Sequence, residues 1–364
     1  MNNDIALSVE NLRVVFNIRQ GIQKTIVDDV DFILRKGEIL GIVGESGSGK
    51  TQTVYSILGI HVQNPGLVKG SVNLLLPDAD GQEKLKNLYE TIIQNTVKIE
   101  HDNNKYRYKK NFKYWRRENK KLFNAHTIRG KKIFIMFQDP KSFLNPFWTV
   151  RKHFYKILSP QNNSPKIMDK LIKETLNKFK LPADKVADLY PHELSGGMCQ
   201  RVMIALGYAV KPDIIIADEI TTGLDLINQV AVVKHLETIK LEKRQSIILI
   251  SHDIGFISKL ADKILVMYDG QGVEYGNSET ILNPQTAKKH PYTKELLDIY
   301  YQTHKDGYIL GEPPRRNDIV EGCRFHKRCK RFNEGMNCSK VAPSDFHRLD
   351  IMEHQIRCKL FQNN

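Results

Sequence analysis

The segment GESGSGKT at residues 44–51 combines residue types and spacing that predict phosphate chemistry. It follows an apolar run, EILGIV, and precedes a helical pattern, TQTVYSIL, so we expect a strand, a loop and a helix in succession. Glycines let backbone N–H groups turn toward phosphate oxygens, and the helix N-terminus adds positive potential. Lys50 would neutralise the β- and γ-phosphates, and Thr51 would offer its hydroxyl to Mg²⁺. The predicted nucleoside triphosphate site comprises Gly44, Glu45, Ser46, Gly47, Ser48, Gly49, Lys50 and Thr51.

Two acidic residues end a second strand-like run, DIIIADE at 213–219. Consecutive branched apolar residues fit a parallel strand that is buried on both faces. Asp218 is placed to hold magnesium through water, and Glu219 follows where a carboxylate can polarise an attacking water. Taken alone, two acidic residues at the end of a strand are equally compatible with solvated side chains that have no catalytic role. Together with the phosphate loop it predicts phosphoryl transfer to water.

The third signal is LSGGMCQR at 194–201, in which a serine and two glycines stand at an expected helix start. Such a turn forms a second nest for an anion. Here the chain resembles the ATPases of ABC transporters, whose signature is LSGGQ. The resemblance implies that ATP is the substrate, with Mg²⁺. It also implies that the signature acts in trans on ATP held by a partner subunit, through Ser195, Gly196, Gly197 and Met198.

Other motifs of the same family follow in the expected order. The resemblance assigns Gln138, in FIMFQDP, to a contact with magnesium and water that faces the membrane subunit. It places Asp225, in TTGLD, at the dimer seam, and His252, in IILISHD, against the γ-phosphate. Phe16, in LRVVF, would stack on adenine, although an ordinary apolar strand residue would look the same.

The resemblance predicts an α/β fold with a RecA-like P-loop core and an antiparallel strand portion near the N-terminus. A helical subdomain at about 139–205 would carry the signature, and residues of roughly 76–125 form an insertion. We expect the nucleotide-binding domain to span 1–279. A small cysteine-rich domain would occupy 280–364.

Longer phrases narrow the resemblance to the D-subunit type of the oligopeptide and dipeptide importer ATPases. These phrases are FQDPKSFLNP, YPHELSGGM, HPYTKELL and GEPP. The branch implies a second, F-type ATPase, two permease subunits and, indirectly, an extracellular peptide-binding protein as partners. The chain would then sit peripherally on the cytoplasmic side of the cell membrane. Importers of dipeptides or nickel are the alternative, because cargo is chosen by other subunits.

Four of the five cysteines lie in the last 42 residues. Their spacing differs from the CxxC pairs of most zinc ribbons. The resemblance implies a [4Fe–4S] cluster, with zinc and unligated thiols as alternatives. The candidate ligands are Cys323, Cys329, Cys338 and Cys358.

The formal charge of +14 comes largely from one segment. Residues 97–132 hold thirteen Lys or Arg and three acids, a net charge of +10. Aromatic residues among these cations suit nucleic acid or an anionic lipid surface, but a solvated extension is our preferred interpretation. A nucleic-acid ATPase on the same cassette is disfavoured because the insertion lacks sustained heptads. No apolar run of membrane-spanning length and no secretory signal is visible.

Overall fold

The computed structural model describes residues 4–18, 22–60, 64–77, 80–102, 105–123, 128–159, 164–243, 245–303, 309, 311–312, 322–332, 337–340, 343 and 354–361. The chain divides into two compact units. The first comprises Met1–Arg35, Leu40–Leu122 and His252–Asn364, and the second comprises Lys36–Ile39 and Phe123–Ser251.

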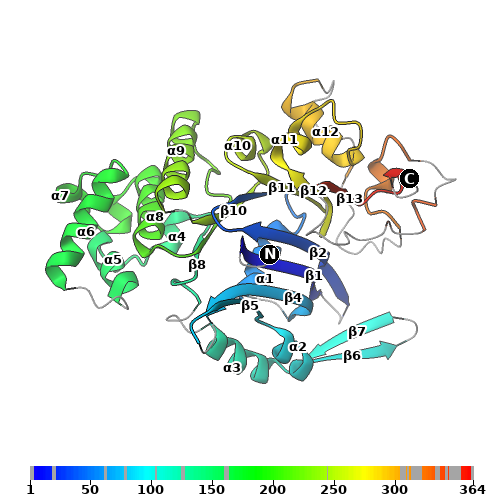
Figure 1. The fold of residues 1–364 in the computed structure, drawn as a ribbon, viewed down its shortest axis with the longest axis horizontal. Coiled ribbons are helices and arrows are strands. Elements are labelled where there is room, and N and C mark those ends of the chain that lie inside the picture. The colour runs from blue at the N-terminus through cyan, green and yellow to red at the C-terminus, as the bar shows by residue number, and fades with distance from the viewer. Residues whose placement is uncertain are drawn as a thin grey trace. The chain divides into compact units, whose positions relative to one another are not determined.

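The first unit contains an antiparallel sheet built from the N-terminal part of the chain (Figure 1). Its strand order is β2–β1–β4–β5. All five residues Ile5–Val9 at the start of β1 are buried, so both faces of this part of the strand are covered. The antiparallel portion predicted near the N-terminus is therefore present. The strands are β1 (Ile5–Asn17), β2 (Gln23–Arg35), β4 (Pro65–Pro77) and β5 (Glu83–Asn87).

The phosphate loop lies between β3 (Ile39–Val43) and α1 (Lys50–Ile57), as the sequence predicts. All five residues of β3 are buried. The strand runs parallel to β11 (Lys263–Tyr268), which pairs with the antiparallel strand β12 (Gln271–Asn277). A Cβ added to Gly41 would lie 2.4 Å from Ile257 Cγ2, so this glycine lets α10 (Ile254–Ser258) pack closely on β3.

The insertion in this unit is folded rather than an extended segment, although most of its cations whose burial is described are exposed. After β5, it consists of two helices and a hairpin (Figure 1). Trp115 is buried and stacks on Tyr89, with ring centroids 5.6 Å apart. Lys110 Nζ lies 3.4 Å from the centre of the Trp115 ring and donates to the carbonyl of Leu67 in β4. The elements are α2 (Glu90–Thr96), β6 (Val97–Asp102), β7 (Lys105–Lys110) and α3 (Phe112–Leu122).

The C-terminal part of the first unit adds short elements to its strands. Strand β13 (His354–Ile356) pairs antiparallel with β12. Before β13 the chain forms α11 (Ser278–Leu282), α12 (Pro291–Tyr300) and a 3₁₀ turn at His326–Arg328. A second 3₁₀ turn, Lys359–Phe361, follows β13.

The second unit has a buried parallel sheet with strand order β10–β9–β8 and a set of helices. Every residue of β9 and β10 is buried, as expected of strands covered on both faces. Helix α8 buries most of its length, including Cys199. The strands are β8 (Ile133–Met136), β9 (Ile214–Asp218) and β10 (Ser246–Ser251). The helices are α4 (Pro140–Phe143), α5 (Val150–Leu158), α6 (Pro165–Lys178), α7 (Ala183–Val186), a 3₁₀ turn at Pro191–Glu193, α8 (Gly196–Val210) and α9 (Leu226–Lys243).

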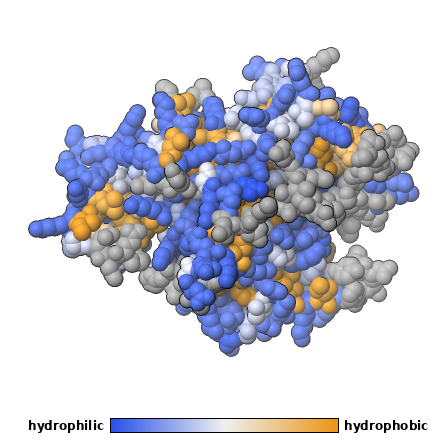
Figure 2. All heavy atoms as spheres, in the orientation of Figure 1, coloured by the Kyte–Doolittle hydropathy of each residue, from blue (hydrophilic) through white to orange (hydrophobic). Residues whose placement is uncertain are grey.

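No helix within the described ranges is long and apolar enough to cross a membrane. The face drawn in Figure 2 is mostly hydrophilic, and its hydrophobic residues form several small patches. Scattered apolar surface of this kind is ordinary for a folded protein in water.

Candidate nucleotide-binding site

The phosphate loop follows β3, and two of its positions favour glycine for different reasons. Gly44 has φ +155°, and a Cβ there would lie 2.1 Å from the carbonyl oxygen of Met267. Gly47 has φ +81°, and none of the described residues comes within 4 Å of the point its Cβ would occupy. The first glycine therefore permits close packing on β11, and the second adopts a left-handed turn that glycine tolerates best.

The polar groups of this loop fit a phosphate ligand. Lys50 is only 4% exposed, and its Nζ donates to the carbonyl oxygens of Gly44 at 2.8 Å and Glu45 at 3.0 Å. The buried hydroxyl of Ser48 has no hydrogen-bond partner among the described residues. A buried ammonium folded over the loop and a spare hydroxyl are groups that phosphate oxygens can satisfy. Thr51 follows Lys50 in the first turn of α1 and is half-buried, and its contact with magnesium stays a prediction.

In the second unit, the structure brings the predicted glutamine and glutamate together. Gln138 Nε2, just after β8, donates to Glu219 Oε2 at 3.2 Å. Glu219 has φ +47°, an unfavourable conformation for a residue with a side chain, and its N–H donates to Ile250 O at 3.0 Å. Asp218, at the end of β9, is 2% exposed. The strand end thus holds Glu219 in one strained orientation, directed at the glutamine.

The signature segment begins a helix, as the sequence predicts. Ser195 is the N-cap of α8, and its hydroxyl accepts a hydrogen bond from the N–H of Met198 at 3.2 Å. Ser195 and Gly196 are exposed, and Gly197 is half-buried. Gln200 on the same helix donates to the carbonyl of Ile220, next to Glu219. The signature is therefore an exposed helix start whose following turn is tied to the end of β9.

The remaining motif residues lie at the ends of elements. Asp225 is exposed, and it caps α9 by accepting from the N–H and the side chain of Asn228, both at 2.8 Å. His252 is exposed, follows β10 and belongs to the first unit. Phe16 is half-buried near the end of β1, opposite Lys24 of β2. The roles in adenine stacking, the dimer seam and phosphate contact stay predictions.

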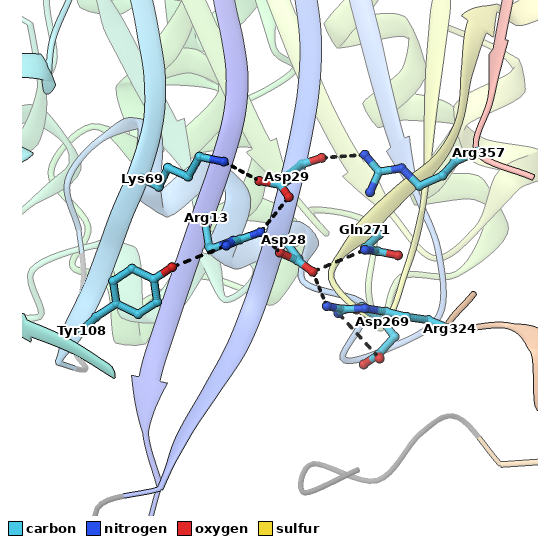
Figure 3. A network of polar contacts seen from close by, with 9 residues as sticks. All are labelled: Arg13, Asp28, Asp29, Lys69, Tyr108, Asp269, Gln271, Arg324 and Arg357. Carbon is cyan, nitrogen blue, oxygen red and sulfur yellow. Dashed lines mark hydrogen bonds and ion pairs between the residues drawn. The ribbon is translucent and has the colours of Figure 1, made fainter. Parts of the chain in front are cut away.

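A polar network that the sequence analysis missed joins distant parts of the first unit (Figure 3). Arg13 in β1 bridges Asp28 at 2.9 Å and Asp29 at 2.7 Å, both in β2, and reaches the hydroxyl of Tyr108 in β7 at 3.4 Å. The same aspartates are contacted from the C-terminal segment by Arg324 and Arg357, as Figure 3 shows. The insertion and the C-terminal segment are therefore both anchored on the antiparallel sheet.

All four C-terminal cysteines line one hollow in the first unit, together with His290 and Phe325. Its volume is about 340 Å³, including space open to solvent. Burial raises the pKa of Cys323 to about 11 and that of Cys358 to about 12. Among the described residues, no three Cys, His, Asp or Glu side chains form a group arranged to hold a metal ion. The predicted [4Fe–4S] cluster, and likewise the zinc alternative and a separate cysteine-rich domain, are not confirmed.

Comparisons with known proteins agree with this fold. Residues 27–222 match the ABC transporter family, and residues 273–335 match the C-terminal region of oligopeptide/dipeptide transporters. The oligopeptide transport ATP-binding protein OppD of Escherichia coli (strain K12) is 35% identical over 93% of this chain and 89% of its own length. The OppD of Lactococcus lactis subsp. cremoris is 34% identical over 82% of this chain and 76% of its own.

One further relative and one solved structure are also similar to this chain. The glutathione import ATP-binding protein GsiA of E. coli is 35% identical over 86% of this chain and 45% of GsiA. The structure of cbiO1 from Clostridium perfringens has a TM-score of 0.55 and 22% identity, covering 78% of this chain and 93% of cbiO1. That likeness shows the cassette fold. Since the family match covers more than half of the 364 residues and both OppD relatives exceed 30% identity, the chain belongs to the ABC transporter family.

Proposed function

We propose that this chain hydrolyses ATP to power an importer of oligopeptides. The observation that carries the proposal is the 35% identity with an oligopeptide transport ATP-binding protein over 93% of the chain. The match of residues 273–335 to a transporter C-terminal region supports it, because that region lies outside the ATPase family match.

The chemistry proposed for the site follows from its groups. Lys50 and the loop N–H groups bind the β- and γ-phosphates, replacing the carbonyl contacts that hold the ammonium in the free chain. Glu219, oriented by Gln138, polarises the attacking water, and His252 contacts the γ-phosphate. Mg²⁺, when bound, would neutralise charge on the phosphates, and Thr51, Gln138 and Asp218 are the residues proposed to hold it.

The proposed assembly is a pair of cassettes on a membrane complex. Ser195, Gly196, Gly197 and Met198 begin α8 at the surface, which suits action on ATP bound to a second, F-type subunit. Asp225 would lie at the seam of that pair. Two permease subunits and an extracellular peptide-binding protein complete the proposal, with this chain peripheral on the cytoplasmic side. Since a glutathione import protein shares the cassette, we assign the choice of cargo to those other subunits.

The test combines partner capture with uptake. The tagged chain is recovered from gently solubilised membranes, and its partners are identified by mass spectrometry. We expect two permeases, a second ATPase and a peptide-binding protein, and we expect a strain lacking this chain to lose uptake of labelled oligopeptides. Dipeptide or nickel uptake lost in place of oligopeptide uptake would point to the related importers. Ribosomes or DNA-processing proteins without a permease would overturn the importer function.

We also propose a [4Fe–4S] cluster in the cysteine hollow, with zinc as the alternative. The shared lining by Cys323, Cys329, Cys338 and Cys358 supports it, because four thiols facing one space are the donor set such a cluster uses. Anaerobic purification followed by metal analysis and visible absorption tests the assignment. Iron and sulfide with a broad visible absorption would support the cluster. Zinc alone would favour the alternative, and no bound metal would end both.

The domain boundaries are proposed with the function. The nucleotide-binding domain would comprise residues 1–279, with the helical subdomain at about 139–205 and the insertion at about 76–125. The C-terminal domain of the oligopeptide-transporter type would comprise 280–364.

A further inference from the structure

An arginine from the C-terminal segment contacts the second residue of the phosphate loop. Arg328 donates from Nη1 to Glu45 Oε2 at 2.7 Å and from Nη2 to Glu45 Oε1 at 3.0 Å. Two parallel bonds between a guanidinium and a carboxylate fix orientation as well as distance. The Arg328 side chain is 3% exposed, whereas that of Glu45 is 29% exposed, so the contact reaches from a buried support to an accessible loop.

The support for this arginine is a cluster of three buried aromatic rings. Tyr268, Tyr292 and Phe325 pack on one another with centroid distances of 4.8 to 5.4 Å. The guanidinium lies 5.6 Å from the Tyr268 ring, and its Nη1 donates to the Tyr268 hydroxyl at 3.3 Å. Rings packed this way leave little room for the arginine to change rotamer.

The backbone of Glu45 is held from the same cluster. Its N–H donates to the hydroxyl of Tyr292, in α12, at 2.8 Å. Its carbonyl oxygen accepts from Lys50 Nζ at 3.0 Å. A continuous path of contacts therefore runs from Arg328 through Glu45 to the lysine that meets the phosphates.

The charge of Glu45 explains why this path of contacts would matter for nucleotide binding. Glu45 places a carboxylate in a loop whose ligand is a polyanion, and like charges at short distance repel. Pairing with Arg328 neutralises that carboxylate and keeps it turned to the C-terminal segment. Without the arginine, the carboxylate would be free to swing and the loop would present negative charge to the phosphates.

We propose that Arg328 is a positioning residue of the nucleotide site, which raises the affinity for nucleoside triphosphate by holding Glu45 and, through it, the phosphate loop. The inference rests on the proposed ATP site and deepens it. It assigns to the C-terminal segment a direct part in nucleotide binding.

The competing explanation is that Arg328 only docks the C-terminal segment on the rest of the unit. Arg357 provides a matched control, because it is also buried, belongs to the same segment and donates to the carbonyl of Asp29 in β2 at 2.8 Å. Loss of either arginine would weaken docking, but only loss of Arg328 would release Glu45.

The test titrates the full-length chain with a fluorescent ATP analogue and records both Kd and the number of sites. We expect Arg328→Met to raise Kd about tenfold at unchanged stoichiometry, since a charged hydrogen-bonded pair contributes at least this much. Arg328→Lys keeps the charge but loses the paired geometry, so its Kd should lie between the wild-type value and that of Arg328→Met. Arg357→Met should stay within about twofold of wild type. A purely structural defect would instead lower the number of sites.

Each remaining outcome counts against the proposal. An unchanged Kd in Arg328→Met would overturn it, and so would an equal rise in Arg357→Met, which would mark general docking as the cause. If thermal unfolding shows that Arg328→Met does not fold, Arg328→Lys decides alone, and a wild-type Kd there would refute the need for the paired contact. A wild-type chain that binds no nucleotide would overturn the proposed function itself.

Discussion

At the scale of single residues, Gln138 contacts Glu219, the residue that we propose as the catalytic carboxylate. Glu219 sits at φ +47° at the end of β9, a conformation that costs free energy and so must be imposed by its surroundings. Its N–H is held by Ile250 and its carboxylate by Gln138. Contacts at the strand ends therefore fix the backbone and side chain of Glu219, as its proposed role in orienting water requires.

Replacing Glu219 by glutamine tests this role. The amide keeps the size and the contact with Gln138 but cannot accept a proton, so we expect ATP to bind and turnover to fall by about 10² or more. The measurement is ATP hydrolysis by the assembled complex alongside nucleotide binding by the chain. Glu237→Gln, at an exposed position on α9, is the matched control and should hydrolyse at the wild-type rate. Normal turnover in Glu219→Gln would remove the assigned role.

The motif residues could be predicted from the sequence, whereas the distant residues that contact and hold them could not. Phosphate chemistry dictates glycines, a lysine and a threonine at fixed spacing, so Lys50 and Thr51 are recognisable in eight residues. The partner of Glu45 lies 283 positions away at Arg328, and no local pattern specifies such a pair. Tyr292 stood within the recognised phrase HPYTKELL, but only the fold shows that its hydroxyl meets the phosphate loop.

At the scale of elements, α12 shows how a buried histidine caps a helix and makes stability depend on pH. His290 is the N-cap, and its Nδ1 accepts from the N–H of Tyr292 at 3.1 Å. Burial, with a smaller contribution from Arg357, lowers the pKa of His290 to about 3. The neutral ring is therefore the folded form, and the unfolded chain binds a proton more readily.

This predicts loss of stability on acidification. Because the folded pKa lies below the ordinary value of about 6.5, the unfolded state gains protons first, and stability falls as pH drops from about 6.5 toward 3. His290→Asn keeps a capping acceptor and removes the titration, so its thermal midpoint should fall less steeply over this range. Chemical or thermal unfolding at several pH values measures the difference. Parallel pH profiles for the two proteins would contradict the assignment.

The insertion illustrates where element prediction from sequence fails. Its many cations suggested a solvated extension, yet β6 and β7 pair residue by residue from Val97 with Lys110 to Asp102 with Lys105. The stretch KYRYKK alternates aromatic and basic residues, a period of two that is compatible with a strand. The helix α3 depends on the burial of Trp115 against Tyr89, a contact that only tertiary structure reveals.

At the scale of the whole molecule, the proposed ATP hydrolysis does not explain why positive charge is concentrated in one segment of the chain. Residues 97–132 carry a net charge of +10, and the cations of β6, β7 and α3 whose burial is described are exposed, apart from Lys110. The aromatic residues Trp115 and Tyr108 are engaged in contacts within the unit. Rings that are packed or hydrogen-bonded are poorly placed to stack on bases. The exposed cations remain able to attract any anionic surface, and a peripheral subunit would meet lipid headgroups first.

We therefore expect salt-sensitive binding of the chain to anionic vesicles that depends on α3. Changing its exposed cations Lys113, Arg116, Arg117, Lys120 and Lys121 to glutamine should reduce sedimentation with phosphatidylserine vesicles at low salt and leave the thermal midpoint nearly unchanged. The control changes five exposed lysines of the second unit and lowers the net charge equally: Lys166, Lys170, Lys173, Lys180 and Lys185. Equal losses in both variants would mean that total charge, rather than the face of α3, draws the protein to the surface. Vesicle binding unaffected by salt would exclude an electrostatic cause.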